Sequence, residues 1–290
     1  MEVSKSTDSR AYVSLLSTDN FANGVLALAH SLKRVGADYP FIVFTTPHVS
    51  PAALSILSES GIAVRPIDYI ENPNAKTPSH PWRHNYCQLG LFDRIEFSKI
   101  VYLDLDMIVC RNIDDVFEAP HFSAVSSGSW LPRLSHWGHL NGGLMVIEPN
   151  HEEFVQLVSR IGKPTSHEGN QGIFSAHFPD WDQRSDLHLD HRYNLMNTHL
   201  DEYHKLYKFR LPQELGVSRS SDDGVTVKVV HYAGPVKPWM MIEKIRQWAR
   251  WRPVVRMRAS MQGKRLEVDS FLLWLKVWDD YIKTQGCIGR

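Results

Sequence analysis

The stretch KIVYLDLD, residues 99–106, joins an apolar strand to two carboxylates at its carboxyl end. In a continuing strand Asp104 and Asp106 would face opposite sides, because side chains alternate along it. Where the strand breaks into a turn, both can converge on one hard cation, since Mg²⁺ and Mn²⁺ prefer oxygen ligands and keep positions open for phosphate oxygens. The pair is therefore a candidate metal site, although such a pair is common in sequences by itself. The alternative is that one aspartate caps a turn and the other is solvated.

Strands and helices alternate ahead of this stretch. Phe21, Val25, Leu28 and Leu32 recur at helical spacing, and Ser50 precedes a proline at a first helical position. Strands are expected at 11–16, 41–45, 62–65 and 99–103, and helices from 21, from 51 and at 88–97. This order predicts an α/β fold with a Rossmann-like, mostly parallel central sheet flanked by helices. The first strand–helix turn has no GxGxxG, so ordinary dinucleotide binding is not supported.

The second half of the chain is less regular. Loops are expected at 121–140, rich in Ser, Gly, Trp and His, and at 182–224, which we interpret as a lid or acceptor loop. The expected elements are strands at 144–147 and 227–232, a helix at 151–161, and a terminal helix with an apolar stripe of Phe271, Trp274, Leu275, Trp278 and Ile282.

Composition limits the classes of protein. The 290 residues carry no net charge, so no broad attraction to nucleic acid or membrane is expected. The N-terminal MEVSKSTDSR is polar and no apolar run of about 18 residues occurs, so neither a secretory signal nor a membrane span is expected. Three scattered cysteines argue against a disulfide framework and favour a reducing, cytoplasmic location.

A second motif is KVVHYAGPVKPW, residues 228–239. A buried strand brings His231 to its end, where an imidazole nitrogen can be a third metal ligand. Gly234 permits close backbone approach, and Lys237 can neutralise a departing diphosphate. The alternatives are a hydrogen-bonded core histidine and a surface lysine.

Two further motifs carry polar side chains beside glycines. In HLNGGLMVIEPN, residues 139–150, Asn141 stands before two glycines and can read a sugar hydroxyl where backbone lies close to a ligand. The alternative is a simple glycine turn into a strand. HEGNQG, residues 167–172, places polar side chains at a helix N-terminus, where ordinary N-capping is the alternative.

In this order, the motifs resemble the retaining glycosyltransferases of family 8, of the glycogenin and galactinol synthase type, which have a GT-A fold. The similarity covers about residues 11–285 and is weakest at 182–224. The matching blocks are AYVSLLSTDNFANGVLALAHSLK, LDLDMIVCRNIDDVF, LNGGLMVIEP, GNQGIFSAHF, VVHYAGPVKPW and FLLWLKVWDDY.

The resemblance implies a metal-dependent hexosyltransferase that moves a hexose from a UDP-sugar to an acceptor hydroxyl with retention, using Mn²⁺ or Mg²⁺. It implies a disordered tail at 1–10 and one GT-A domain at 11–285. Within the domain, 11–110 would bind nucleotide, 111–240 the donor sugar and acceptor, and 241–285 would be helical. The acceptor would be a small molecule or a glycan. A self-glucosylating primer using Tyr193, Tyr203 or Tyr207, or a nucleotide-sugar-binding protein with impaired catalysis, are the alternatives.

The resemblance also assigns roles by position. Asp104, Asp106 and His231 would hold the metal, and Asn170, Gln171 and Lys237 would be catalytic. In the nucleotide-sugar site, Leu15, Ser17, Thr18 and Phe21 would surround uridine, and Leu105 would lie near the ribose. Gly234 and Lys237 would contact the diphosphate, and Asn141, Gly142 and Gln171 the donor sugar. Gln88 and the three metal ligands would complete the site.

Two positions depart from the family pattern. Gln88 stands where relatives carry Lys, and Asn170 where glycogenins carry Asp. Asn170 cannot form a glycosyl ester as a carboxylate would, and nearby Glu168 is a candidate to compensate. Because one lost charge is positive and the other negative, the two changes are expected to be coupled. They put donor identity, rate and activity in question.

Residues 244–265 contain eight Lys or Arg and no acidic residue, with Trp248 and Trp251 interleaved. Such a stretch can make peripheral contact with anionic lipid, and the alternative is a solvated helix face. No recognised nucleic-acid-binding module is present, so nucleic acid is not an expected partner. A homodimer is compatible with the resemblance.

Overall fold

The computed structural model describes residues 9–77, 80, 82–126, 128–166, 169–212, 215 and 223–288. The chain forms two compact units. The first unit consists of Met1–Asp19, Tyr39–Leu103 and Asp115–Asp190, and the second of Asn20–Asp38, Asp104–Asp114 and His191–Arg290. Residues 1–8 of the expected tail lie outside the described residues. The tail and the boundaries within 11–285 stay predictions.

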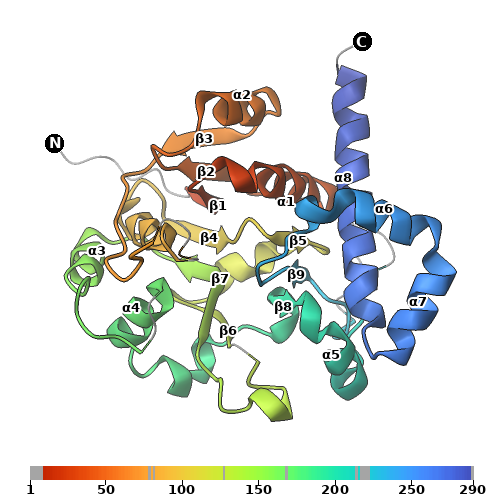
Figure 1. Ribbon diagram of the computed structural model, residues 1–290. Coiled ribbons are helices and arrows are strands. Elements are labelled where there is room, and N and C mark those ends of the chain that lie inside the picture. Colours follow the sequence, from red (N-terminus) through yellow and green to blue (C-terminus); the bar gives the residue numbers. More distant parts are fainter. Residues whose placement is uncertain are drawn as a thin grey trace. The chain divides into compact units, whose positions relative to one another are not determined.

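The first unit is built on a six-stranded sheet in the order β3-β2-β1-β4-β7-β6 (Figure 1). Its first four strands pair in parallel, and β7 and β6 are antiparallel additions. This confirms the predicted α/β fold with a mostly parallel sheet. The strands are β1 (Arg10–Leu16), β2 (Phe41–Thr45), β3 (Ala63–Pro66), β4 (Lys99–Leu103), β6 (Ala124–Ser126) and β7 (Leu140–Ile147). The α-helices of this unit are α2 (Pro51–Glu59), α3 (His151–Val158) and α4 (Asn170–His177).

Local sequence explains these elements. The central strand β1 is buried from Ala11 to Leu16, as expected of a parallel strand covered on both faces. Helix α2 begins as predicted, because the Ser50 hydroxyl accepts a hydrogen bond from the Ala53 N–H at 3.2 Å. The strand predicted at 144–147 begins four residues earlier, at Leu140, because Leu140 and Asn141 pair with β6.

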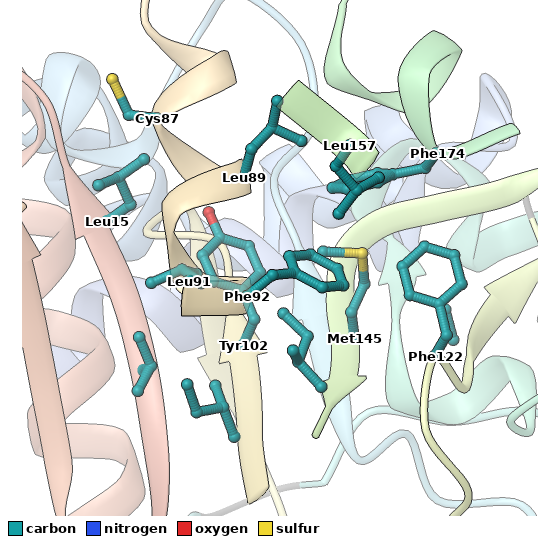
Figure 2. Close-up of a cluster of buried hydrophobic side chains, with 14 of the residues drawn as sticks. Leu15, Cys87, Leu89, Leu91, Phe92, Tyr102, Phe122, Met145, Leu157 and Phe174 are labelled. Carbon is teal, nitrogen blue, oxygen red and sulfur yellow. The ribbon is translucent and has the colours of Figure 1, made fainter. Parts of the chain in front are cut away.

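A cluster of buried apolar side chains fills the first unit. Figure 2 shows Phe92, Phe122, Met145, Leu157 and Phe174 pointing toward one another from different elements. The rings of Phe92 and Phe174 lie 5.8 Å apart, and Phe122 and Phe174 meet edge to face at 5.4 Å. Dense packing of this kind fixes the elements that carry Gln88, Asn141 and Gln171.

The helix predicted at 88–97 is wrong in type and position. The segment Asn85–Asp93 forms η2, a 3₁₀ helix. All seven residues from Tyr86 to Phe92 are buried, so the one-face periodicity of a surface helix does not apply. A Cβ on Gly90 would lie 3.0 Å from the Ile67 side chain, which shows how closely this segment packs.

The second unit has a three-stranded sheet in the order β5-β9-β8, formed by Met107–Val109, Val229–His231 and Leu195–Met196. Strand β9 pairs with β5 antiparallel and with β8 in parallel. Helix α1 (Ala22–Arg34) contacts β5 and α8. The remaining helices are α5 (Leu200–Tyr207), α6 (Ile242–Arg250), α7 (Arg252–Met261) and α8 (Arg265–Ile288).

Two expectations in this unit need correction. Within the predicted loop at 182–224, residues Leu200–Tyr207 form helix α5, because Leu200 and Tyr203 are buried and the Tyr203 ring stacks on Phe209 at 5.6 Å. In the predicted stripe of α8, Ile282 is 48% exposed. Its neighbour Tyr281 is buried instead and packs against His30 of α1. Among the described helices, none combines the length and apolarity needed to cross a membrane.

Candidate metal centre and donor-sugar residues

The three predicted metal ligands converge in the second unit. Ligand atoms of Asp104, Asp106 and His231 all lie within 4.8 Å of one another. The His231 Nε2 atom lies 3.2 Å from Asp106 Oδ1 and 3.8 Å from Asp104 Oδ2. Two carboxylates and one imidazole form a donor set that can hold a divalent cation.

Strand register produces this convergence. The chain turns through Asp104, Leu105 and Asp106 before β5 begins at Met107, and Met107 pairs with His231 across β5 and β9. A hydrogen bond of 2.8 Å from the Tyr232 N–H to the Asp106 carbonyl extends the pairing. The end of β9 is therefore fixed beside the turn that carries both aspartates.

Asn194 orients the imidazole, and the sequence analysis did not find it. Its Oδ1 lies 2.9 Å from His231 Nδ1. An Nδ1–H that donates to this oxygen leaves the Nε2 lone pair facing the carboxylates, the arrangement a metal-bound histidine needs. Asn194 lies directly ahead of β8, which pairs with β9, and no local sequence signal distinguishes it from an asparagine in a turn.

Lys237 is the fourth charged group of this cluster. Its Nζ donates to Asp106 Oδ2 at 2.5 Å and to the Tyr232 carbonyl at 3.1 Å, and the side chain is buried. Lys237 is therefore no surface lysine, the alternative that the sequence left open. It places one full positive charge on the carboxylate that also faces His231.

The charges of this cluster shift its pKa values. Burial by itself raises the pKa of Asp106, but His231, followed by Lys237, outweighs burial and holds that pKa well below its usual range. Burial by itself lowers the pKa of His231, but the charge and hydrogen bond of Asp106 outweigh it and raise that pKa above its ordinary value. Asp106 thus stays ionised and available to a cation. Below the raised pKa of His231 a metal must displace a proton from the imidazole, so metal affinity falls as the pH falls through that pKa.

Helix α1 packs directly on the turn between the aspartates. A Cβ built on Gly24 would lie 2.4 Å from the Leu105 carbonyl oxygen and 2.9 Å from the Trp239 ring. The Trp239 Nε1–H donates to the Asn20 carbonyl at 2.9 Å, and the ring meets Phe21 edge to face at 5.5 Å. Gly24 was missed because a glycine inside a helical pattern reads as a weak helix former.

Two other predicted residues of this unit lie near Lys237. The Phe21 ring centroid is 6.0 Å from Lys237 Nζ, which places this aromatic side chain beside the lysine that faces Asp106. Gly234 has a φ of +111°, a backbone conformation that L side chains rarely adopt. This loop therefore requires glycine between β9 and Lys237.

Hydrogen bonds link Gly142 and Gln171, both predicted to face the donor sugar, to Gln88 and Asn170 in the first unit. Gln88 Nε2 donates to the Gly142 carbonyl at 3.3 Å, and Gln171 Nε2 donates to the Leu140 carbonyl at 3.0 Å. The Asn170 side chain donates to Gln88 Oε1. Asn170 and Gln88, the two departures from the family pattern, therefore contact each other directly.

The rest of the network is also made of amides. Asn85 Nδ2 donates to Asn170 Oδ1 at 3.0 Å, and the Gln171 N–H donates to the same oxygen at 3.0 Å. Asn141 is buried and accepts from the Gly143 N–H at 3.0 Å. Asn85 was not among the predicted site residues, because an asparagine ahead of an apolar run carries no strong signal. Glu168, the candidate to compensate for Asn170, lies outside the described residues.

The predicted uridine residues of β1 lie at its carboxyl end. The Leu15 side chain is part of the apolar cluster shown in Figure 2 and is 8% exposed. Ser17 and Thr18 are half-buried, and the Ser17 carbonyl accepts from the Thr46 hydroxyl at 3.0 Å. The Leu15 side chain is thus packed into the apolar core of the first unit.

The Gln88–Asn170 contact predicts strong coupling between charge substitutions. Gln88→Lys alone buries a cation without a counterion, and Asn170→Asp alone sets a carboxylate against Gln88 Oε1, so each is expected to cost about 2–4 kcal/mol of unfolding free energy. Together they can form an ion pair, and the double variant is expected to recover about 1–3 kcal/mol relative to the sum. Urea denaturation measures the unfolding free energy of the unsubstituted chain, the two single variants and the double variant.

The control for this cycle uses the same substitutions at exposed positions. Gln156→Lys on α3 and Asn20→Asp, which lie in different units, are expected to change stability little and additively. Additive effects at Gln88 and Asn170 as well would contradict the direct contact.

Comparison with known proteins agrees with this geometry. A family model described as glycosyl transferase family 8 matches residues 12–188. The chain belongs to glycosyl transferase family 8. This confirms the resemblance seen in the sequence motifs.

Among relatives of this family 8 member is inositol phosphorylceramide glucuronosyltransferase 1 of Arabidopsis thaliana, 29% identical over 79% of this chain. The glycogenin-1 proteins of Caenorhabditis elegans and Oryctolagus cuniculus are each 30% identical, over 80% and 79% of this chain. The chain spans 42%, 51% and 65% of these three proteins, so it corresponds to only part of each.

Solved structures show the fold. The galactosyltransferase LgtC, in complex with donor and acceptor sugar analogues, matches 79% of this chain and 89% of its own with a TM-score of 0.51 and 19% identity. GlyE of Streptococcus pneumoniae matches 79% of this chain and 56% of its own with a TM-score of 0.53 and 18% identity. The family 8 chain therefore has the predicted GT-A fold.

Proposed function

We propose that this family 8 glycosyltransferase moves a hexose from a UDP-sugar to an acceptor hydroxyl with retention of configuration, using Mn²⁺ bound by Asp104, Asp106 and His231. The observation that carries the proposal is the convergence of these three ligands within 4.8 Å. Mn²⁺ is favoured over Mg²⁺ because one ligand is an imidazole, and Mg²⁺ prefers an all-oxygen shell.

The residues of the second unit would prepare the departure of the nucleoside diphosphate. A bound Mn²⁺ supplies Lewis-acid stabilisation of the leaving diphosphate. Asp106 stays ionised to hold the cation, and Asn194 keeps the His231 ring turned toward it. Lys237 carries a second positive charge beside Asp106, where it can offset charge that builds on the diphosphate.

The amide network of the first unit would bind the donor sugar. Asn141 and Gln171 can exchange hydrogen bonds with sugar hydroxyls, since an amide both donates and accepts. The side chain at 170 is an amide and cannot form a glycosyl ester. We therefore propose that the acceptor hydroxyl attacks on the face from which the diphosphate leaves, without a covalent enzyme intermediate at Asn170.

Self-glucosylation is a second candidate function, and the burial of the three tyrosines limits which of them can accept a sugar. Tyr203 is 3% exposed, and the Tyr193 hydroxyl accepts a hydrogen bond from Lys228 Nζ at 2.6 Å. Tyr207 is 37% exposed and is therefore the best placed of the three tyrosines to accept a sugar. A free small molecule or glycan is the acceptor that we favour.

A donor panel tests the proposed function. The chain is incubated with MnCl₂ and UDP-glucose, UDP-galactose, UDP-N-acetylglucosamine or UDP-glucuronate, a donor named for relatives acting on xylan. We expect UDP release from at least one donor, abolished by a chelator, and no hexose ladder by intact-mass analysis. Calorimetric binding of a donor without any release would instead support the catalytically impaired alternative, and a ladder lost in Tyr207→Phe would support the primer.

A further inference from the structure

Positive charge is concentrated in one segment of the second unit. Residues 244–265 carry eight of the 32 Lys and Arg residues and no acidic residue, although the chain as a whole has no net charge. The segment forms most of α6, all of α7 and the start of α8. Figure 1 shows α6 and α7 following one another beside α8, and both helices contact α8.

Part of this charge is neutralised within the unit, and part is not. Arg246 pairs with Glu243 and Asp279, and Arg256 pairs with Asp269 at 2.9 Å. Three further arginines are exposed and form no ion pair with any residue that the structure describes: Arg250, Arg252 and Arg258. Together with the exposed Lys244, these three arginines give the surface its surplus positive charge.

Exposed apolar side chains accompany these arginines. Trp251 is 60% exposed, Val254 42%, Met257 59% and Met261 74%. Trp251 directly precedes α7, and the spacing of three and four residues places the other three on one face of this helix, while Ala259 is buried on another. A surface helix normally turns its apolar stripe inward, whereas α7 also carries one outward.

A hollow lies next to this stripe. Arg252, Arg256 and Arg265 line it together with Pro253, Met257 and Ser260, and its volume is about 500 Å³. Asp269 holds the Arg256 guanidinium in place, and a hydroxyl stands among the three cations. Guanidinium groups match phosphate oxygens in geometry as well as charge.

We propose that α6 and α7 dock this protein onto an anionic phospholipid bilayer. Trp251, Met257 and Met261 enter the boundary between headgroups and acyl chains, and the arginines bind lipid phosphates, with one headgroup in the hollow. Charge complementarity requires an anionic partner, and the outward aliphatic side chains favour a membrane over a nucleic acid. A phosphate backbone offers them no apolar surface, whereas the bilayer boundary does. The docking does not depend on the proposed reaction.

Vesicle co-sedimentation of the full chain tests this proposal. Vesicles of phosphatidylcholine with phosphatidylserine are expected to bind the protein, and vesicles of phosphatidylcholine alone to bind it far more weakly. The double variant Arg252→Gln, Arg258→Gln is expected to bind anionic vesicles roughly 30-fold more weakly, since each basic residue near the surface contributes about 1 kcal/mol. The matched control is Lys163→Gln with Lys205→Gln, which removes the same charge from exposed positions elsewhere.

A second pair of variants tests whether the exposed apolar side chains insert into the bilayer. At about 0.5 M NaCl the charge attraction is largely screened, so residual binding reports insertion of apolar side chains. Met257→Ser with Met261→Ser is expected to abolish this residual binding. The exposed pair Ile56→Ser and Val155→Ser on α2 and α3 is expected to leave it unchanged.

Three results would overturn the proposal. One is equal binding to vesicles with and without phosphatidylserine. Another is an equal loss of binding to anionic vesicles in the double arginine variant and in its lysine control. The third is failure to bind anionic vesicles while a short single-stranded DNA is bound, which would assign the surface to nucleic acid.

Discussion

Replacement of Asp106 by Asn is expected to lower metal-dependent UDP release about a thousandfold, because a bound cation supplies several kcal/mol of stabilisation to the leaving group. The substitution removes the one carboxylate that faces both His231 and Lys237. Manganese binding measured by calorimetry should fall in parallel. UDP release at an unchanged rate would refute the metal assignment.

The same substitution also leaves the buried Lys237 cation without its counterion. Loss of metal binding must therefore be distinguished from loss of stability. Lys237 would lose its counterion and keep neutral partners such as the Tyr232 carbonyl, and breaking a buried ion pair costs about 3–5 kcal/mol. The double variant Asp106→Asn, Lys237→Met removes the stranded charge and is expected to recover most of the thermal stability. It is not expected to recover manganese binding.

Asp180→Asn on the exposed surface is the matched control for the substitution itself. It should change neither manganese binding nor unfolding. Recovery of metal binding in the double variant would mean that Asp106 acts through folding alone and is no ligand.

The sequence predicted the parts of the site that a strand carries to its end. The strand 99–103 places Asp104 and Asp106, and β9 places His231, because apolar runs bounded by polar residues show where buried strands stop. The convergence itself depends on the register Met107↔His231, which joins segments more than 100 residues apart. Register of this kind is set by tertiary packing and leaves no local signal, so local patterns could not show that the three ligands meet, and the family resemblance alone assigned them to one metal.

The 3₁₀ helix and two asparagines of the site could not be predicted either, because they too depend on tertiary contacts. The 3₁₀ helix Asn85–Asp93 is buried on all sides, and a periodicity argument requires one exposed face. Asn194 and Asn85 act through single hydrogen bonds to His231 and Asn170. An asparagine in a sequence predicts a turn or a cap as readily as such a contact.

Gly24→Ala is the second substitution with a large expected effect, and helix propensity predicts the opposite sign. In the interior of a helix, alanine is about 1 kcal/mol more favourable than glycine. Here the added Cβ would lie 2.4 Å from the Leu105 carbonyl oxygen, a backbone atom that cannot rotate away. We expect a net loss of about 1–3 kcal/mol in unfolding free energy, as for other overpacked positions.

The turn at Leu105 must shift to admit this methyl group, and it carries Asp104 on one side and Asp106 on the other. Manganese affinity is therefore expected to fall about tenfold or more, in the range seen when the groups that orient metal ligands are disturbed. Calorimetry at neutral pH measures this loss. Gly138→Ala is the control, because its Cβ would meet nothing closer than Ser129 Cβ at 4.0 Å.

A double variant identifies the atom responsible. Trp239 is the other neighbour of the added methyl group, with ring atoms at 2.9 and 3.0 Å. Gly24→Ala with Trp239→Leu relieves that contact and leaves the Leu105 carbonyl in place. Manganese affinity should remain low in the double variant, because the turn is still displaced. Full recovery would show that the indole ring, and not the backbone between the aspartates, sets the requirement for glycine at this position of α1.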